Sequence, residues 1–253
     1  MSYNVHLCKI LQKKEIAPRI VEMQIKNPAL AKEAKPGQFL HIKCGDTTAM
    51  TLRRPISICD VEGDVIRFIF EVKGKGTQAL FASKEDMLDV LGPVGNGFTV
   101  DNVKYKNPAV IGGGIGVYPL YFLTRQLDDA KVFLGFRNKS LVTLEDDFKG
   151  VASSVSVATD DGSYGHHGFA LDLLKMSVSQ GPCDVIYACG PKGMLKAIKA
   201  FAEETGIPCQ ISLEERMGCG IGACLTCTCK SSDGEHVRVC RNGPVFWTEE
   251  VEL

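Results

Sequence analysis

Four cysteines near the end of the chain have the spacing of an iron–sulfur site. Cys219, Cys224, Cys227 and Cys240 are separated by four, two and twelve residues. The first two gaps match the plant-type C-x4-C-x2-C run, which holds a [2Fe–2S] cluster through four thiolates. Because each iron takes two thiolates, three ligands are expected from one tight loop and the fourth from a returning strand. The spacing therefore predicts a two-iron centre at these residues.

Other uses of these cysteines fit the sequence less well. The run contains three alternating glycines: Gly218, Gly220 and Gly222. Glycine suits a loop around a cluster because it adopts positive φ angles at little cost. Zinc sites usually show paired C-x2-C knuckles, and only Cys224 and Cys227 form one here. Disulfides are disfavoured because the chain has no secretory signature. The remaining cysteine of the run, Cys229, is expected to point into packing.

Composition limits the classes of protein that the chain can form. Its 253 residues predict two or three domains, and an apolar fraction of 45% with 23% charged residues is typical of a globular protein. The 29 basic and 30 acidic residues give a net charge of −1, which offers no general attraction to nucleic acid or to an anionic membrane. No signal peptide and no apolar run near the ~20 residues of a membrane span are found. We expect a cytoplasmic location.

The first hundred residues have the pattern of an antiparallel barrel. Four short alternating runs, bounded by turns at 35–37 and 62–64, predict strands at 5–10, 20–25, 38–43 and 65–72. The absence of a long helix between them favours a barrel. A short helix is expected from Thr77. His6 and His41 lie in these strands and are expected to be hydrogen-bonded barrel residues.

Two segments of this region have residue types that bind phosphate. Arg-Arg-Pro-Ile-Ser at 53–57 precedes a strand at 58–59, and an arginine fork suits a pyrophosphate. Lys-Gly-Lys-Gly-Thr at 73–77 precedes the short helix, whose first N–H groups bind phosphate oxygens. Taken alone, the first segment fits a strand start with solvated arginines, and the second fits an ordinary glycine loop.

The pattern of apolar residues changes after Pro108. The stretch 109–116 is predicted to be a buried strand that runs into a glycine turn, and further strands are predicted at 131–136, 155–159 and 184–188. They alternate with helices at 117–127, 169–176 and 191–204, which indicates a parallel doubly wound sheet. A ligand is expected at the carboxyl ends of its strands. The glycines at 112–116 lack the G-x-G-x-x-G spacing, so they favour a phosphate or dinucleotide without the NAD fingerprint. Cys-Gly-Pro at 189–191 falls on the same edge, where an ordinary loop is the alternative.

The order of these motifs resembles the ferredoxin-reductase superfamily. Three further stretches resemble the electron-transfer subunits of dihydroorotate dehydrogenase B: Asp-Asp-Gly-Ser-Tyr-Gly at 160–165, the run at 213–224, and Val-Cys-Arg-Asn-Gly-Pro-Val-Phe at 239–246. The resemblance covers essentially the whole chain. One departure is Tyr118-Pro119, where relatives often carry two prolines. The resemblance implies an FAD-binding β-barrel at 1–102, an NAD-binding α/β domain at 103–212 and a [2Fe-2S] domain at 213–253.

The resemblance also implies a function. Electrons would pass from the FMN of a dihydroorotate dehydrogenase catalytic subunit, in a heterotetramer of two plus two, through the cluster and FAD to NAD⁺ in pyrimidine biosynthesis. No residue of this chain is expected to act as an acid or base. The implied FAD contacts are Arg54, Pro55, Ile56, Ser57, Ile69, Phe70, Glu71, Gly76 and Thr77. The implied NAD contacts are Gly112, Gly113, Gly114, Gly116, Cys189, Gly190 and Pro191.

Two alternatives remain open from the sequence. The same fold serves as the small subunit of an NAD(P)H–ferredoxin reductase or sulfide dehydrogenase. A zinc-stabilised binding protein with a purely structural barrel and sheet is a different class. The choice between NAD and NADP is also open, since Arg137 and Lys139 either favour a 2′-phosphate or are simply solvated.

Overall fold

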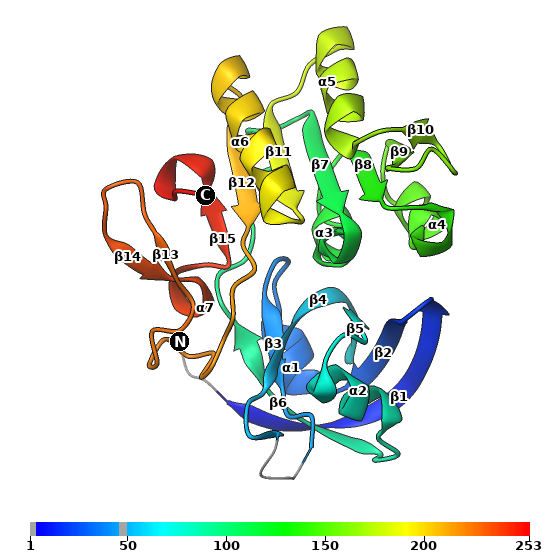
Figure 1. Ribbon diagram of the computed structural model, residues 1–253, viewed down its shortest axis with the longest axis vertical. Coiled ribbons are helices and arrows are strands. Elements are labelled where there is room, and N and C mark those ends of the chain that lie inside the picture. Colours follow the sequence, from blue (N-terminus) through cyan, green and yellow to red (C-terminus); the bar gives the residue numbers. More distant parts are fainter. Residues whose placement is uncertain (1–3, 46–49) are drawn as a thin grey trace.

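The computed structural model describes residues 4–45 and 50–253. Figure 1 shows a β-barrel at the bottom, an α/β sheet at the top and a small C-terminal segment beside both. The barrel and the sheet with its flanking helices confirm the predicted fold class. Within the described ranges, no helix is both long and apolar enough to cross a membrane.

The barrel is closed by six strands in the order β1-β2-β5-β4-β3-β6, and every neighbouring pair is antiparallel. The strands are β1 (Val5–Ala17), β2 (Ile20–Lys26), β3 (Phe39–Ile42), β4 (Arg54–Glu62), β5 (Val65–Glu71) and β6 (Met87–Val94). Two helices accompany them: α1 (Pro28–Glu33) and α2 (Lys75–Ala82). The Arg-Pro-Ile-Ser segment was predicted to precede a strand, whereas it forms the first part of β4. The sequence prediction also omitted β6.

Alternation along β4 and β5 gives the barrel two different faces. Ile58 and Phe68 are fully buried inside the barrel. Cys59 and Ile69, on the opposite face, belong to the core that the barrel shares with the α/β domain. The outer face of β4 and β5 is therefore partly covered by the second domain, at Cys59 and Ile69.

The α/β domain contains a seven-stranded sheet in the order β10-β9-β8-β7-β11-β12-β15. The strands are β7 (Pro108–Gly113), β8 (Lys131–Phe136), β9 (Ser154–Thr159), β10 (His166–His167), β11 (Val185–Cys189), β12 (Cys209–Ser212) and β15 (Val245–Trp247). All neighbours are parallel except β15, which runs antiparallel to β12. Strand β7 is the first strand of this sheet in the chain and lies near its middle, so the strand order reverses between β7 and β11. A crevice for a ligand is expected at this reversal.

Helices cover both faces of this sheet, which explains why its central strands β7 and β11 are largely apolar and buried. The helical segments are η2 (Gly114–Val117), α3 (Tyr118–Thr124), η3 (Lys139–Leu141), α4 (Glu145–Lys149), α5 (Ala170–Gln180) and α6 (Lys192–Thr205). Val110 of β7 packs in the core that includes α3 and α4, and Ile111 packs in the core that includes α5 and α6. Helix α3 starts with Pro119 in its first turn, where proline is tolerated.

The C-terminal segment is joined to both larger parts. It consists of the hairpin β13 (Thr228–Lys230) and β14 (His236–Arg238), the short helix α7 (Val239–Asn242), β15 and η4 (Thr248–Glu250). Strand β15 completes the edge of the α/β sheet. Asn96, just after the barrel, forms a parallel bridge with Pro244. The segment that carries the four cysteines is thus fixed against the barrel and the sheet together.

Candidate functional site

The four predicted cluster cysteines lie together as two pairs. The backbone N–H groups of Ala223 and Cys224 donate to Cys219 Sγ at 3.2 and 3.4 Å, and the Cys219 N–H donates to Cys224 Sγ at 3.4 Å. The Cys240 N–H donates to Cys227 Sγ at 3.4 Å. In the described residues no group of three or more metal-binding side chains surrounds a single point. Two pairs of thiols are the donor set that two irons need.

Backbone conformation explains the glycines of this loop. Gly220 and Gly222 have φ angles of 72° and 84°, which side chains rarely adopt. A Cβ added at Gly218 would lie 3.1 Å from Cys224 Sγ, where little room exists. The Arg238 guanidinium donates to the carbonyl of Gly222 at 2.9 Å and ties the loop to β14. The loop conformation and its N–H donors therefore fit a group of thiolates.

The two pairs differ in environment. Cys224 is exposed, and hydrogen bonds from Thr226 and from Cys219 lower the pKa of its thiol to about 6. Cys227 and Cys240 are buried, and burial together with the neighbouring Cys227 thiol raises the pKa of Cys240 to about 12. A bound cation is what ionises thiols at such a position. Cys240 thus needs iron to be charged, while Cys224 is exposed to solvent.

Two details of this segment differ from or add to the sequence prediction. Cys240 was expected on a returning strand, but it lies in the short helix α7 that follows β14, because β14 ends at Arg238. Cys229 lies on β13, is half-buried and packs against the core of the α/β domain.

The predicted FAD residues of two separate segments are in contact. A Cβ added at Gly76 would lie 2.6 Å from Arg54 Nε, so the guanidinium rests directly on the first turn of α2. The Arg54 charge and the N–H groups of this turn therefore face the same small space. A pyrophosphate needs this combination of donors. Arg53, which had no predicted role, pairs with Asp89 of β6 at 2.8 Å and anchors the strand.

The remaining FAD residues divide between the two faces of the barrel. Ser57 and Ile69 point outward, and Ile69 packs toward the α/β domain. Ile56 and Phe70 are buried in the barrel core. Their side chains therefore cannot line a flavin on the outer face, and only their backbone is available for such a contact.

The two segments predicted to bind NAD also meet. Cys189 of β11 is paired in register with Gly112 of β7. A Cβ added at Gly116 would lie 2.5 Å from the carbonyl carbon of Cys189. The two loops thus leave the carboxyl ends of adjacent strands at the point where the strand order reverses. A small cavity of about 100 Å³ lies beside these loops. It is lined by Gly190, Pro191 and, from the C-terminal segment, Cys229.

His41 of β3 lies where the barrel touches the cluster loop. Its side chain is 1% exposed, and a Cβ added at Gly220 would overlap the imidazole. Burial and the nearby Arg53 charge lower the pKa of His41 to about 4, while the backbones of Cys219 and Arg53, which lie near the ring outside hydrogen-bond geometry, act in the opposite direction. Neither ring nitrogen has a hydrogen-bond partner in the described part of the chain. The prediction that His6 and His41 are hydrogen-bonded was therefore wrong for His41, and His6 Nε2 is likewise unpartnered.

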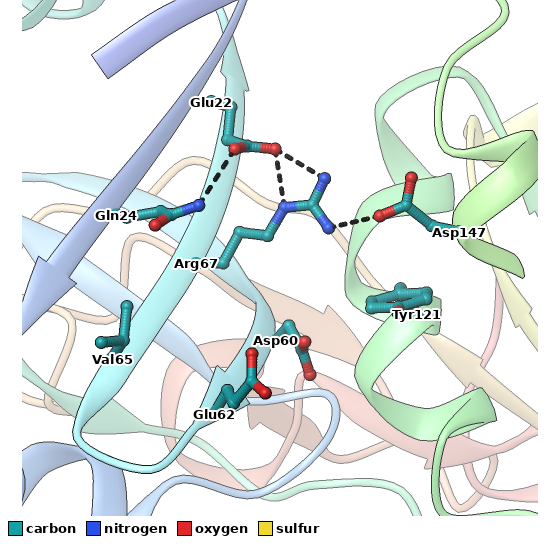
Figure 2. A pocket seen from close by; sticks show the side chains of 8 residues that line it. All are labelled: Glu22, Gln24, Asp60, Glu62, Val65, Arg67, Tyr121 and Asp147. Carbon is teal, nitrogen blue, oxygen red and sulfur yellow. Dashed lines mark hydrogen bonds and ion pairs between the residues drawn. The ribbon is translucent and has the colours of Figure 1, made fainter. Parts of the chain in front are cut away.

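A cavity of about 390 Å³ lies between the barrel and the α/β domain (Figure 2). Figure 2 shows Arg67 of β5 between Glu22 of β2 and Asp147 of α4. Both Arg67 ion pairs are short, at 2.6 and 2.7 Å. Arg125 forms a second interdomain pair with Asp60 at 2.7 Å. Sequence reasoning missed this network because its members are far apart in the chain, and no local spacing indicates it.

Solved structures with the same fold bind flavin and nicotinamide. An NADH-dependent reduced ferredoxin-NADP oxidoreductase, described for flavin-based electron bifurcation, aligns with a TM-score of 0.87 and 32% identity over 98% of this chain and 90% of that chain. A ferredoxin NADP⁺ reductase from Neisseria gonorrhoeae, solved with bound FAD and NADP, aligns with a TM-score of 0.68 at 16% identity over 84% of this chain and 94% of that chain. The fold is that of the ferredoxin reductases.

Relatives that align with almost the whole chain show which family within this class it belongs to. A protein of Caldanaerobacter subterraneus is 39% identical over 96% of both chains, and one of Bacillus velezensis is 42% identical over 94% of this chain and 95% of its own. Both are dihydroorotate dehydrogenase B (NAD(+)) electron transfer subunits. The family model for the iron-sulfur cluster binding domain of dihydroorotate dehydrogenase B matches residues 214–252. The chain belongs to this family of electron transfer subunits.

Proposed function

We propose that this chain transfers electrons from the FMN of a dihydroorotate-oxidising catalytic subunit, through its own [2Fe–2S] cluster and FAD, to NAD⁺. The observation that carries the proposal is the packing of the cluster loop on the barrel. His41 contacts Gly220 of that loop and pairs in register with Pro55 of the proposed flavin strand β4. One strand therefore separates the two cofactor segments.

Each segment of the chain has a task in this scheme. FAD, when bound, exchanges single electrons with a cluster and a hydride with nicotinamide. Arg54 and the first turn of α2, including Gly76 and Thr77, hold its pyrophosphate, while Ser57 and the outer face of β5 border its ring. The loops at 112–116 and 189–191 hold NAD at the reversal of the strand order. Cys219 with Cys224, and Cys227 with Cys240, each hold one iron.

We further propose that these tasks divide the chain at residues 1–102, 103–212 and 213–253. The third unit is not autonomous in this arrangement, because its strand β15 completes the sheet of the second. This continuity supports a fixed distance between the cluster and the nucleotide domain.

The catalytic subunit is proposed to dock at the exposed side of the cluster loop. Cys224 is exposed, and the neighbouring Leu225 is 60% exposed. This exposed apolar side chain lies next to a proposed cluster ligand, which supports docking at this side of the loop. We propose an assembly of two copies of each subunit in the cytoplasm.

Anaerobic co-expression with candidate catalytic subunits tests the proposal. The complex is expected to reduce NAD⁺ in the presence of dihydroorotate, while the purified chain alone oxidises NADH with an artificial acceptor and leaves dihydroorotate unchanged. A Cys227→Ala variant of the complex should lose the first activity. Dihydroorotate turnover by this chain without a partner would overturn the assignment.

A second candidate function is the small subunit of an NAD(P)H–ferredoxin reductase. The TM-score of 0.87 to the NADH-dependent oxidoreductase favours it. Co-purification separates the two, since an FMN-containing partner supports the first function and a larger FAD-containing partner supports the second.

A further inference from the structure

The outer face of the barrel, where β3 meets the cluster loop, contains a buried imidazole without hydrogen bonds to its ring nitrogens in the described part of the chain. His41 is 1% exposed, and neither Nδ1 nor Nε2 has a partner among the described residues. A buried neutral imidazole carries one N–H donor, and buried donors are almost always satisfied in folded proteins. An unmade hydrogen bond of a buried group is costly, so a polar atom supplied by a bound group beside this ring would stabilise the arrangement.

The position of His41 identifies that partner. On one side, its backbone pairs with Pro55 of β4, and its carbonyl accepts a hydrogen bond from Arg53 at 3.3 Å. On the other side, its ring lies against Gly220, with a hypothetical Gly220 Cβ only 2.9 Å from Cε1. Gly220 follows the ligand Cys219 directly. The chain thus places this imidazole beside the iron–sulfur loop. A bound cluster would add sulfur atoms there, and these accept hydrogen bonds.

We propose that His41 is a positioning residue for the cluster: it seats the Cys219–Gly220 segment against β3 and donates its N–H to a sulfur on the Cys219 side of the bound [2Fe–2S] group. The inference rests on the proposed function only in requiring that the cluster is present. Hydrogen bonds to cluster sulfurs favour the more negative, reduced form, and thereby raise the reduction potential.

The test compares variants of the intact complex, or of the full chain purified anaerobically, by redox titration followed through the electron paramagnetic resonance signal of the reduced cluster. His41→Leu keeps a similar volume and removes the donor. Its equilibrium constant for cluster reduction should fall about tenfold, which is about 59 mV for a one-electron couple. His41→Asn and His41→Gln place an amide N–H near the positions of Nδ1 and Nε2, and one of them should restore most of the shift.

A matched control uses another histidine of the cluster segment. His236 of β14 is exposed, so His236→Leu should leave the potential unchanged. An equilibrium constant for His41→Leu within twofold of the wild-type value, with a full complement of iron, would overturn the proposal.

Two further outcomes are decisive where a variant loses iron. Loss of the cluster in His41→Leu but not in the better amide variant supports the donor role. Loss in all three variants leaves only a packing role and overturns the hydrogen bond to sulfur. A wild-type chain without any two-iron signal would instead refute the proposed function, so the two failures are distinguishable.

Discussion

Replacement of Arg67 by methionine should weaken the junction between the barrel and the α/β domain. Arg67 Nε and Nη2 both lie 2.6 Å from Glu22 Oε2, and Nη1 lies 2.7 Å from Asp147 Oδ1. The guanidinium carbon also stands 5.8 Å from the centre of the Tyr121 ring. Arg67→Met preserves most of the apolar stem and removes all of these interactions.

The magnitude follows from the burial of the partners. Glu22 is 8% exposed, and without Arg67 its carboxylate keeps, in the described part of the chain, a hydrogen bond from the Gln24 amide at 3.3 Å. An unpaired charge costs about 3–5 kcal/mol when it is fully buried. The Arg67 side chain is 19% exposed, so water will reach the carboxylate and reduce this loss to about 2 kcal/mol. The Asp147 pair adds about 0.5–1 kcal/mol, because that side chain is 35% exposed.

The assay is thermal unfolding of the cofactor-loaded chain followed by circular dichroism. A loss of about 2–3 kcal/mol corresponds to a fall in Tm of about 5–10 °C for a protein of this size. Asp147→Asn, which breaks only the interdomain pair, should lower Tm by about 1–4 °C. Glu22→Gln added to Arg67→Met should recover at least half of the loss, because it removes the unpaired charge.

Two results would refute this reasoning. If Arg67→Met lowers Tm no more than Asp147→Asn does, the Glu22 carboxylate is not buried as described. If the double variant is as unstable as Arg67→Met, the loss does not come from an uncompensated charge.

Three further predictions concern the cofactor sites. Gly116→Ala should slow reduction of the flavin by NADH at least about tenfold, with FAD content unchanged. The new Cβ would lie 2.5 Å from the Cys189 backbone, and overpacking costs about 1–3 kcal/mol. Stopped-flow absorbance measures the rate of flavin reduction. Arg54→Leu should weaken FAD binding about tenfold or more, since a charged hydrogen bond contributes about 1.5–3 kcal/mol, as measured by flavin fluorescence on dilution. Cys227→Ser should abolish the two-iron absorption while Cys229→Ser preserves it, and an equal loss of iron in both variants would contradict the ligand assignment.

The fold class followed from the sequence because local signals were strong. Short alternating runs predicted the barrel, and apolar strands alternating with helices predicted the parallel sheet. Strand β6 escaped prediction because Met87–Val94 includes Gly92 and Pro93, which read as turn residues. Strand β15, three residues long, exists through its pairing with β12, and such pairing leaves no periodic pattern in the sequence.

The candidate site was predictable where its residues are neighbours in the chain. Within the cluster run, the spacing predicts four cysteine ligands, and in the structure Cys219 lies beside Cys224 and Cys227 beside Cys240. The role of His41 was misread, because a strand pattern gives the face of a side chain but not what packs over it. Its contact with Gly220 joins residues far apart in sequence.

By itself, the sequence determined the kinds of element and the glycines that a tight loop requires, and it predicted the donor set for iron, since these depend on residues within a few positions of one another. Only the tertiary structure decided that Arg54 rests on Gly76, that the loops at 112–116 and 189–191 touch, and that Arg67 joins two domains. Such contacts depend on how strands are ordered in space. Chain folding sets that order through the burial of whole faces, and no short stretch of sequence encodes it.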